Sequence, residues 1–100
     1  MATATEEKEQ VLPSAKILQH ASKLALTQDK PIMMDYWVES HTPGKVIIGV
    51  RSNEEKILLR SEDEYTSPIS KLYKVGEEFI LITENSIYLV SAKIQSRKIN

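Results

Sequence analysis

The feature that most constrains this sequence is a change in apolar periodicity at Pro31. Before Pro31, apolar side chains recur at the three- and four-residue spacing of one helix face, and after it short apolar runs alternate with turn residues. Such runs, joined by connections of about two to six residues, are typical of hairpin-linked antiparallel strands. The sequence therefore predicts a mainly β, α+β fold, with one N-terminal amphipathic helix packed on a small antiparallel sheet of five or six strands, or on a half-open barrel.

The helix is predicted over residues 14–27. Proline is tolerated in the first helical turn and serine is a favoured N-cap, so Pro13 and Ser14 mark its start. A residue before proline avoids helical dihedral angles, so the helix ends before Pro31. The apolar stripe expected to dock on the sheet comprises Ile17, Leu18, Ala21, Leu24 and Ala25.

The strands are predicted from six apolar runs at residues 32–38, 46–50, 57–60, 69–75, 79–82 and 87–90. Turn residues separate these runs: Gly44 after Pro43 suits a type II turn, Gly76 marks a reversal, and Asn85 tolerates a positive φ. Side chains alternate between the two faces of a strand, and the expected core positions are Ile48, Val50, Leu59, Phe79, Leu81 and Leu89.

The runs at residues 79–82 and 87–90 are apolar on both faces. This pattern is typical either of central strands covered on both sides or of strands with one face covered by a partner chain. One helix supplies little material for a second face, so we expect self-association or a protein partner.

A chain of 100 residues is long enough for one compact core. We expect one globular domain at residues 11–96, preceded by a flexible acidic arm at residues 1–10 and followed by a basic tail at residues 97–100. The sequence has no cysteine, no secretory signal pattern and no apolar run of about 18 residues. We therefore expect an intracellular, cytoplasmic protein without a membrane span.

The formal net charge of −1 disfavours nucleic acid as a partner, because binding a phosphate backbone draws on a basic excess. The charge is unevenly distributed: residues 31–90 hold ten acids and six bases, whereas residues 91–100 hold three bases and no acid. The C-terminal end is thus a small basic exception in an acidic body.

No residue pattern in the sequence is typical of catalysis or of metal binding. His20 and His41 have no second imidazole or thiol at ligand spacing, and no Gly-x-Ser-x-Gly elbow or phosphate-binding glycine loop occurs. The acidic run at residues 62–64 lacks the spacing of a calcium loop and is interpreted as a solvated loop. We expect a protein that is not an enzyme, with no cofactor, no metal and no small-molecule substrate.

Partner contacts are predicted at residues of the types that dominate interface hot spots, which are aromatic residues and arginine. The run at residues 32–38 holds the most distinctive aromatic cluster, and strand alternation would place Tyr36 and Trp37 on opposite faces, one in the core and one at a contact surface. The predicted contact residues are Tyr36, Trp37, Tyr88, Arg97 and Lys98.

Three segments carry a family resemblance: KPIMMDYW at residues 30–37, SEDEYTSPI at 61–69 and TENSIYLVS at 83–91. Together they resemble small proteins of unknown function encoded by large DNA viruses of algae and protists, over roughly residues 30–91. The resemblance implies a viral origin, a role in the virion or its assembly, and a location in the virion. It implies no catalytic, cofactor or metal residues.

Three functions are consistent with these observations. The first is a non-enzymatic structural or assembly protein, such as a minor capsid or virion component, that works through protein–protein contacts. The second is a small regulatory protein-binding module. The third is a weak nucleic-acid binder of Sm-like or barrel type, which would use the C-terminal bases and the aromatic run at residues 32–38.

Overall fold

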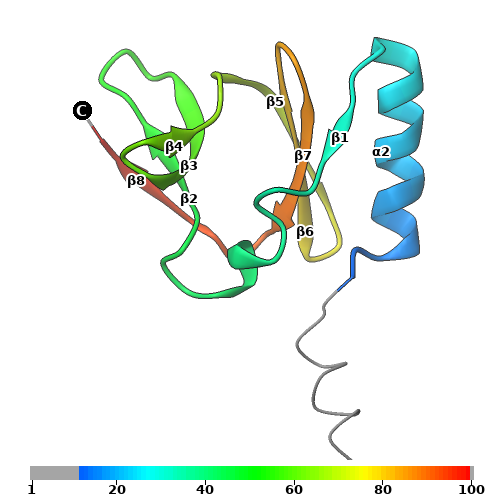
Figure 1. Ribbon diagram of the computed structural model, residues 1–100, viewed down its shortest axis with the longest axis horizontal. Coiled ribbons are helices and arrows are strands. Elements are labelled where there is room, and N and C mark those ends of the chain that lie inside the picture. Colours follow the sequence, from blue (N-terminus) through cyan, green and yellow to red (C-terminus); the bar gives the residue numbers. More distant parts are fainter. Residues whose placement is uncertain (1–11, 100) are drawn as a thin grey trace, which may run out of the picture.

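Figure 1 shows the computed structural model of the chain, which describes residues 12–99. Within these residues, one α-helix is followed by a short 3-10 helix and eight strands in two sheets, so the predicted mainly β, α+β class is confirmed. The predicted arm at residues 1–10 lies outside the described residues. The elements are α2 (Ala15–Gln28), β1 (Ile32–Met33), η1 (Glu39–His41), β2 (Ile47–Val50), β3 (Lys56–Ser61), β4 (Glu64–Tyr65), β5 (Ile69–Val75), β6 (Glu78–Thr83), β7 (Ile87–Ser91) and β8 (Gln95–Lys98).

The strands form two mixed four-stranded sheets instead of one antiparallel sheet or half-open barrel. The first sheet has the strand order β1-β7-β6-β5, and the second has the order β4-β3-β2-β8. Each sheet contains one parallel pair, β1 with β7 and β2 with β8. The partners in these pairs are far apart in sequence, and local periodicity carries no information about such pairing.

The C-terminal residues belong to the second sheet. The predicted domain boundary after residue 96 falls inside β8, which pairs with β2 along its whole length. The Ile99 N–H then donates to the Val50 carbonyl oxygen at 2.8 Å. Gly49 makes room for this strand, because a Cβ there would lie 2.7 Å from Cδ1 of Ile99. Arg97 and Lys98 therefore lie on an ordered strand rather than on a tail.

Helix α2 begins at its predicted N-cap and ends, as predicted, before Pro31. Ser14 Oγ accepts a hydrogen bond from the Ile17 N–H at 3.2 Å, and Asp29 ends the helix in the left-handed region at a φ of 56°. Ile17 and Ala21 are buried, whereas Leu18, predicted in the docking stripe, is exposed. The helix packs against one face of the first sheet (Figure 1).

The run at residues 32–38 is not a continuous strand. Only Ile32 and Met33 are extended, and the chain then turns at residues 35–38 into η1. The predicted alternation is therefore wrong, because a turn, unlike a strand, directs the neighbouring Tyr36 and Trp37 both into the interior.

Two buried clusters cover the first sheet on its two faces. The helix-side cluster comprises Ile17, Ala21, Trp37, Ile80, Ile82, Ile87 and Leu89. The inter-sheet cluster comprises Tyr36, Val46, Ile48, Leu58, Leu81 and Val90. Of the other predicted core positions, Val50, Leu59 and Phe79 are half-buried. The first sheet is the middle layer between α2 and the second sheet (Figure 1).

Candidate functional site

The predicted contact residues do not form one surface. Trp37 is 2% exposed in the helix-side cluster and Tyr36 is 7% exposed in the inter-sheet cluster. Tyr88 is half-buried, and its ring meets that of Tyr36 edge-on with centroids 5.6 Å apart. Arg97 and Lys98 are exposed, but they lie on β8 at the edge of the second sheet. Burial leaves Tyr36 and Trp37 little surface to offer to a partner.

The buried Tyr36 belongs to a polar junction centred on Arg60. The Arg60 guanidinium lies 4.9 Å from the Tyr36 ring centroid and donates to Glu39 Oε1 at 2.7 Å and to Glu64 Oε1 at 3.1 Å. Hydrogen bonding to Glu39 and Glu64 raises the pKa of Arg60, and burial raises the pKa of Tyr36 against the opposing charge of Arg60. The junction joins β3 to β4 and η1, so it has a structural role.

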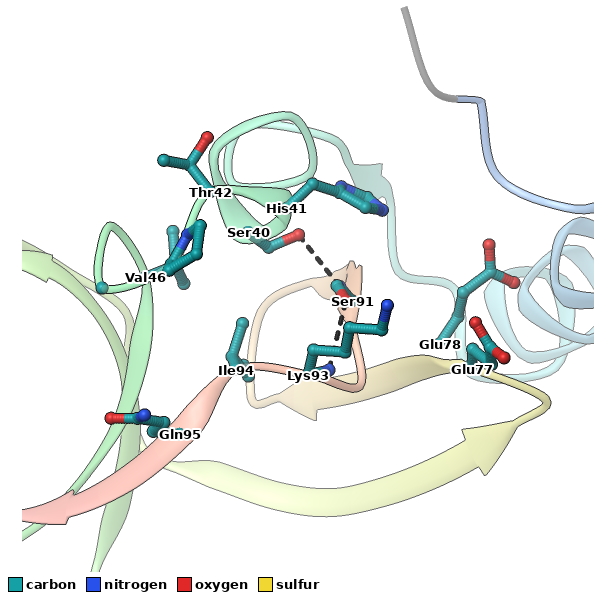
Figure 2. Close-up of a pocket in the computed structure, with 12 residues that line it drawn as sticks. Ser40, His41, Thr42, Val46, Glu77, Glu78, Ser91, Lys93, Ile94 and Gln95 are labelled. Carbon is teal, nitrogen blue, oxygen red and sulfur yellow. Dashed lines mark hydrogen bonds between the residues drawn. The ribbon is translucent and has the colours of Figure 1, made fainter. Parts of the chain in front are cut away.

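Figure 2 shows a pocket of about 340 Å³ between η1, the turn before β6 and the connection from β7 to β8. Ser40 lies at its base, where its Oγ donates to the Trp37 carbonyl oxygen at 2.6 Å and accepts the Ser91 N–H at 2.9 Å. Ser91 Oγ in turn accepts the Lys93 N–H at 3.1 Å. Both hydroxyl groups therefore hold the backbone of this region together.

His41 is the only imidazole at this pocket, and its contacts do not activate a nucleophile. Its Nδ1 lies 3.0 Å from the Trp37 carbonyl oxygen, which only accepts, so Nδ1 carries a hydrogen. Its ring packs edge-on against the Trp37 ring at 4.5 Å. Within residues 12–99, no hydrogen bond joins His41 to a serine hydroxyl or to a carboxylate, and no group of three or more acids or histidines is placed to hold a metal ion. The pocket offers polar groups for binding rather than a nucleophile paired with a base.

A second candidate site is the outer edge of β5. In the described part of the chain β5 pairs only with β6, and the pair is closed by a two-residue turn in which Gly76 has a φ of 61°, as a type II′ turn requires. The closing residues of such a turn, Val75 and Glu78, exchange ladder hydrogen bonds, and bonded pairs then alternate along the strands. The main-chain N–H and C=O groups of Leu72 and Lys74 consequently point away from β6.

Two observations support this assignment of the β5 edge. The Thr83 N–H donates to the Ser86 carbonyl oxygen at 2.9 Å, on the β7 side of β6, as the alternation requires. Leu72 and Tyr73 are each 39% exposed, and they project to opposite faces of the sheet. The edge therefore combines free main-chain groups with an exposed apolar side chain on each face.

A groove of about 530 Å³ runs beside this edge, between α2 and β5. Its apolar wall comes from Leu24, Val75 and Ile80, and three lysines from the two elements line it, Lys16, Lys23 and Lys74. Sequence reasoning missed this site because the bases of a helix and of a strand come together only in the folded chain. The available signal was the complete absence of acids from residues 15–28 and 69–75.

Comparisons of this chain with protein-family models, with curated proteins and with solved structures found no match. The resemblance to proteins of large DNA viruses stays a prediction. In the described residues, no helix has the length and apolar character needed to cross a membrane.

Proposed function

We propose that this chain is a non-enzymatic protein-binding module that takes up an extended segment of a partner protein along the outer edge of β5. The observation that carries the proposal is the free edge of the seven-residue strand β5, with Leu72 and Lys74 directing their main-chain groups outward. Strand addition draws affinity from main-chain hydrogen bonds and specificity from alternate side chains. Leu72 and Tyr73 supply a contact on each face of the sheet.

The other sheet edges are shorter and offer fewer main-chain groups for pairing with a partner strand. Strands β1 and β4 have two residues each and β8 has four, whereas β5 has seven. Lys71 and Lys74 also place positive charge along β5, and lysines on an edge oppose pairing with an identical strand. This charge favours a different protein over a second copy of the chain as the occupant.

The two other expected functions relate to this proposal in different ways. A structural role in a virion would use the same edge for contacts with a neighbouring protein, and the location would then be the virion instead of the cytoplasm. Nucleic-acid binding through the aromatic run at residues 32–38 is disfavoured, because Tyr36 and Trp37 are buried in the core and base stacking needs an open ring face.

The experiment is a selection of random peptides, displayed on phage, against the full chain, followed by amide exchange of the chain with a selected synthetic peptide. We expect the peptide to slow exchange at Leu72 and Lys74, whose N–H groups face solvent in the free chain. Lys74→Pro removes one outward donor and no ladder bond, so affinity should fall about two- to tenfold. The matched variant Lys74→Ala keeps the N–H group and should lose less affinity. Peptides that protect other amides and leave Leu72 and Lys74 unprotected, or a selection without enrichment, would refute the proposal.

A further inference from the structure

The elements that border the β5 edge share an unusual charge. Helix α2 and β5 together contain Lys16, Lys23, Lys71 and Lys74 and no acid, although the chain as a whole has a formal charge of −1. Every acid of the chain therefore lies elsewhere in the sequence. The acids that adjoin these elements are Asp29, at the C-cap of α2, and Glu77 and Glu78, in the β5–β6 turn and at the start of β6, where the carboxylate of Glu78 is bound to Ser14.

The geometry directs three of these bases, Lys16, Lys23 and Lys71, to one face of an added strand, whereas Lys74 lies opposite Phe79 and projects to the other face. Lys71 and Tyr73 are opposite Ile82 and Ile80, which face α2, so both project on the helix side of the first sheet. Lys16 and Lys23 are two helical turns apart on α2 and both line the groove. A strand added beside β5 would place every second side chain toward these lysines and the exposed ring of Tyr73.

We infer that the occupant of the β5 edge is an acidic extended segment of a partner protein, with Asp or Glu at the alternate positions that face α2. This inference rests on the proposed strand addition and names its partner class. The free main-chain groups favour a peptide over a nucleic acid, because a nucleotide backbone has no repeating N–H and C=O groups to pair with a strand edge. Exposed ion pairs are individually weak, so the acidic preference adds to the main-chain affinity and does not replace it.

The test compares two synthetic peptides of alternating residues, one with Glu and Val and the other with Gln and Val. With three lysines near the bound acids, we expect the Glu peptide to bind about five- to tenfold more tightly at low salt. The difference should shrink as NaCl rises from about 20 mM to about 300 mM, because salt screens exposed charges. Both peptides should protect the amides of Leu72 and Lys74 from exchange.

The double variant Lys16→Gln, Lys23→Gln should remove most of the preference by bringing the affinity for the Glu peptide close to that for the Gln peptide. The matched control is Lys45→Gln, Lys56→Gln, which changes two exposed lysines outside the groove and should preserve the preference. Equal affinities, with both peptides protecting Leu72 and Lys74, would overturn the acidic preference and leave strand addition standing. Protection by neither peptide would contradict strand addition as well. Tighter binding of single-stranded oligouridylate in the groove, or a dimer of the chain that protects the same amides, would overturn the inferred occupant.

Discussion

The central strands and the edge strand of the first sheet differ in a way that their sequences conceal. Strands β6 and β7 are apolar on both faces, and both faces are covered by the same chain: Ile80 and Leu89 face α2, whereas Leu81 and Val90 face the second sheet. Strand β5 is mostly exposed, and one side of its backbone has no partner strand among the described residues. An apolar side-chain pattern therefore indicates that a face of a strand is covered. It does not indicate whether the edge of the strand is open, because an open edge consists of unpaired main-chain groups.

This difference removes the sequence argument for a partner. The two-sided apolar runs predicted either internal cover or a partner chain, and the second sheet supplies the internal cover. The case for a partner now rests on β5, whose position at the edge of the first sheet is not evident from its sequence.

The largest expected effect is on the free energy of unfolding when buried side chains of β6 are truncated. Ile80→Ala and Leu81→Ala, one on each face of β6, should each lower the free energy of unfolding by about 2 to 5 kcal/mol, because each leaves a cavity in a fully buried cluster. Leu72→Ala is the matched control, since Leu72 lies directly opposite Leu81 and is partly exposed, and its cost should be about 1 kcal/mol or less. Urea unfolding measures all three. A cost near that of Leu72→Ala for either β6 variant would mean that the chain does not cover that face.

A smaller effect on the free energy of unfolding is expected at the N-cap of α2, the helix that covers one face of the first sheet. Ser14 Oγ accepts the Ile17 N–H and donates to Glu78 Oε1 at 2.8 Å, so this N-cap also joins α2 to β6. Ser14→Ala should lower the free energy of unfolding by about 1 kcal/mol. Ser22→Ala, at an exposed position within the helix, should be neutral or slightly stabilising because alanine is the better helix former. Equal losses in thermal or urea unfolding would argue against the cap.

The smallest effect concerns Tyr36, between the two sheets. Burial raises the pKa of Tyr36 in the folded chain above its unfolded value, so its protonated form contributes stability that is present below about pH 10 and is lost as pH rises through the folded pKa. In Tyr36→Phe, the alkaline decline in the free energy of unfolding should be shallower. Absorbance titration of tyrosinate should show the loss of one late-titrating group. An unchanged alkaline decline would contradict a raised pKa at Tyr36.

Capping and turn residues in the sequence were sufficient to predict several local parts of the fold. Ser14 begins α2, Gly76 forms the reversal between β5 and β6, and Gly44 adopts the positive φ of 79° that its predicted turn requires. Asn85 lies in the predicted reversal between β6 and β7 without using the positive φ that it tolerates, because Thr83 Oγ1 accepts the N–H groups of Asn85 and Ser86 and holds that turn in another way. Caps and turns are predictable when the stabilising groups are close in sequence.

The sequence by itself determined the fold class, the helix with its N-cap and its end before Pro31, and the presence of short strands, because periodicity and capping act within a few residues. Only the tertiary structure decided the division into two sheets, the parallel pairing of β8 with β2, and the turn that buries both Tyr36 and Trp37. The same holds for the candidate site: Lys16 on α2 and Lys74 on β5 line one groove beside a free edge. Each of these features joins residues distant in sequence, and such contacts are selected by the packing of the whole chain rather than by local preference.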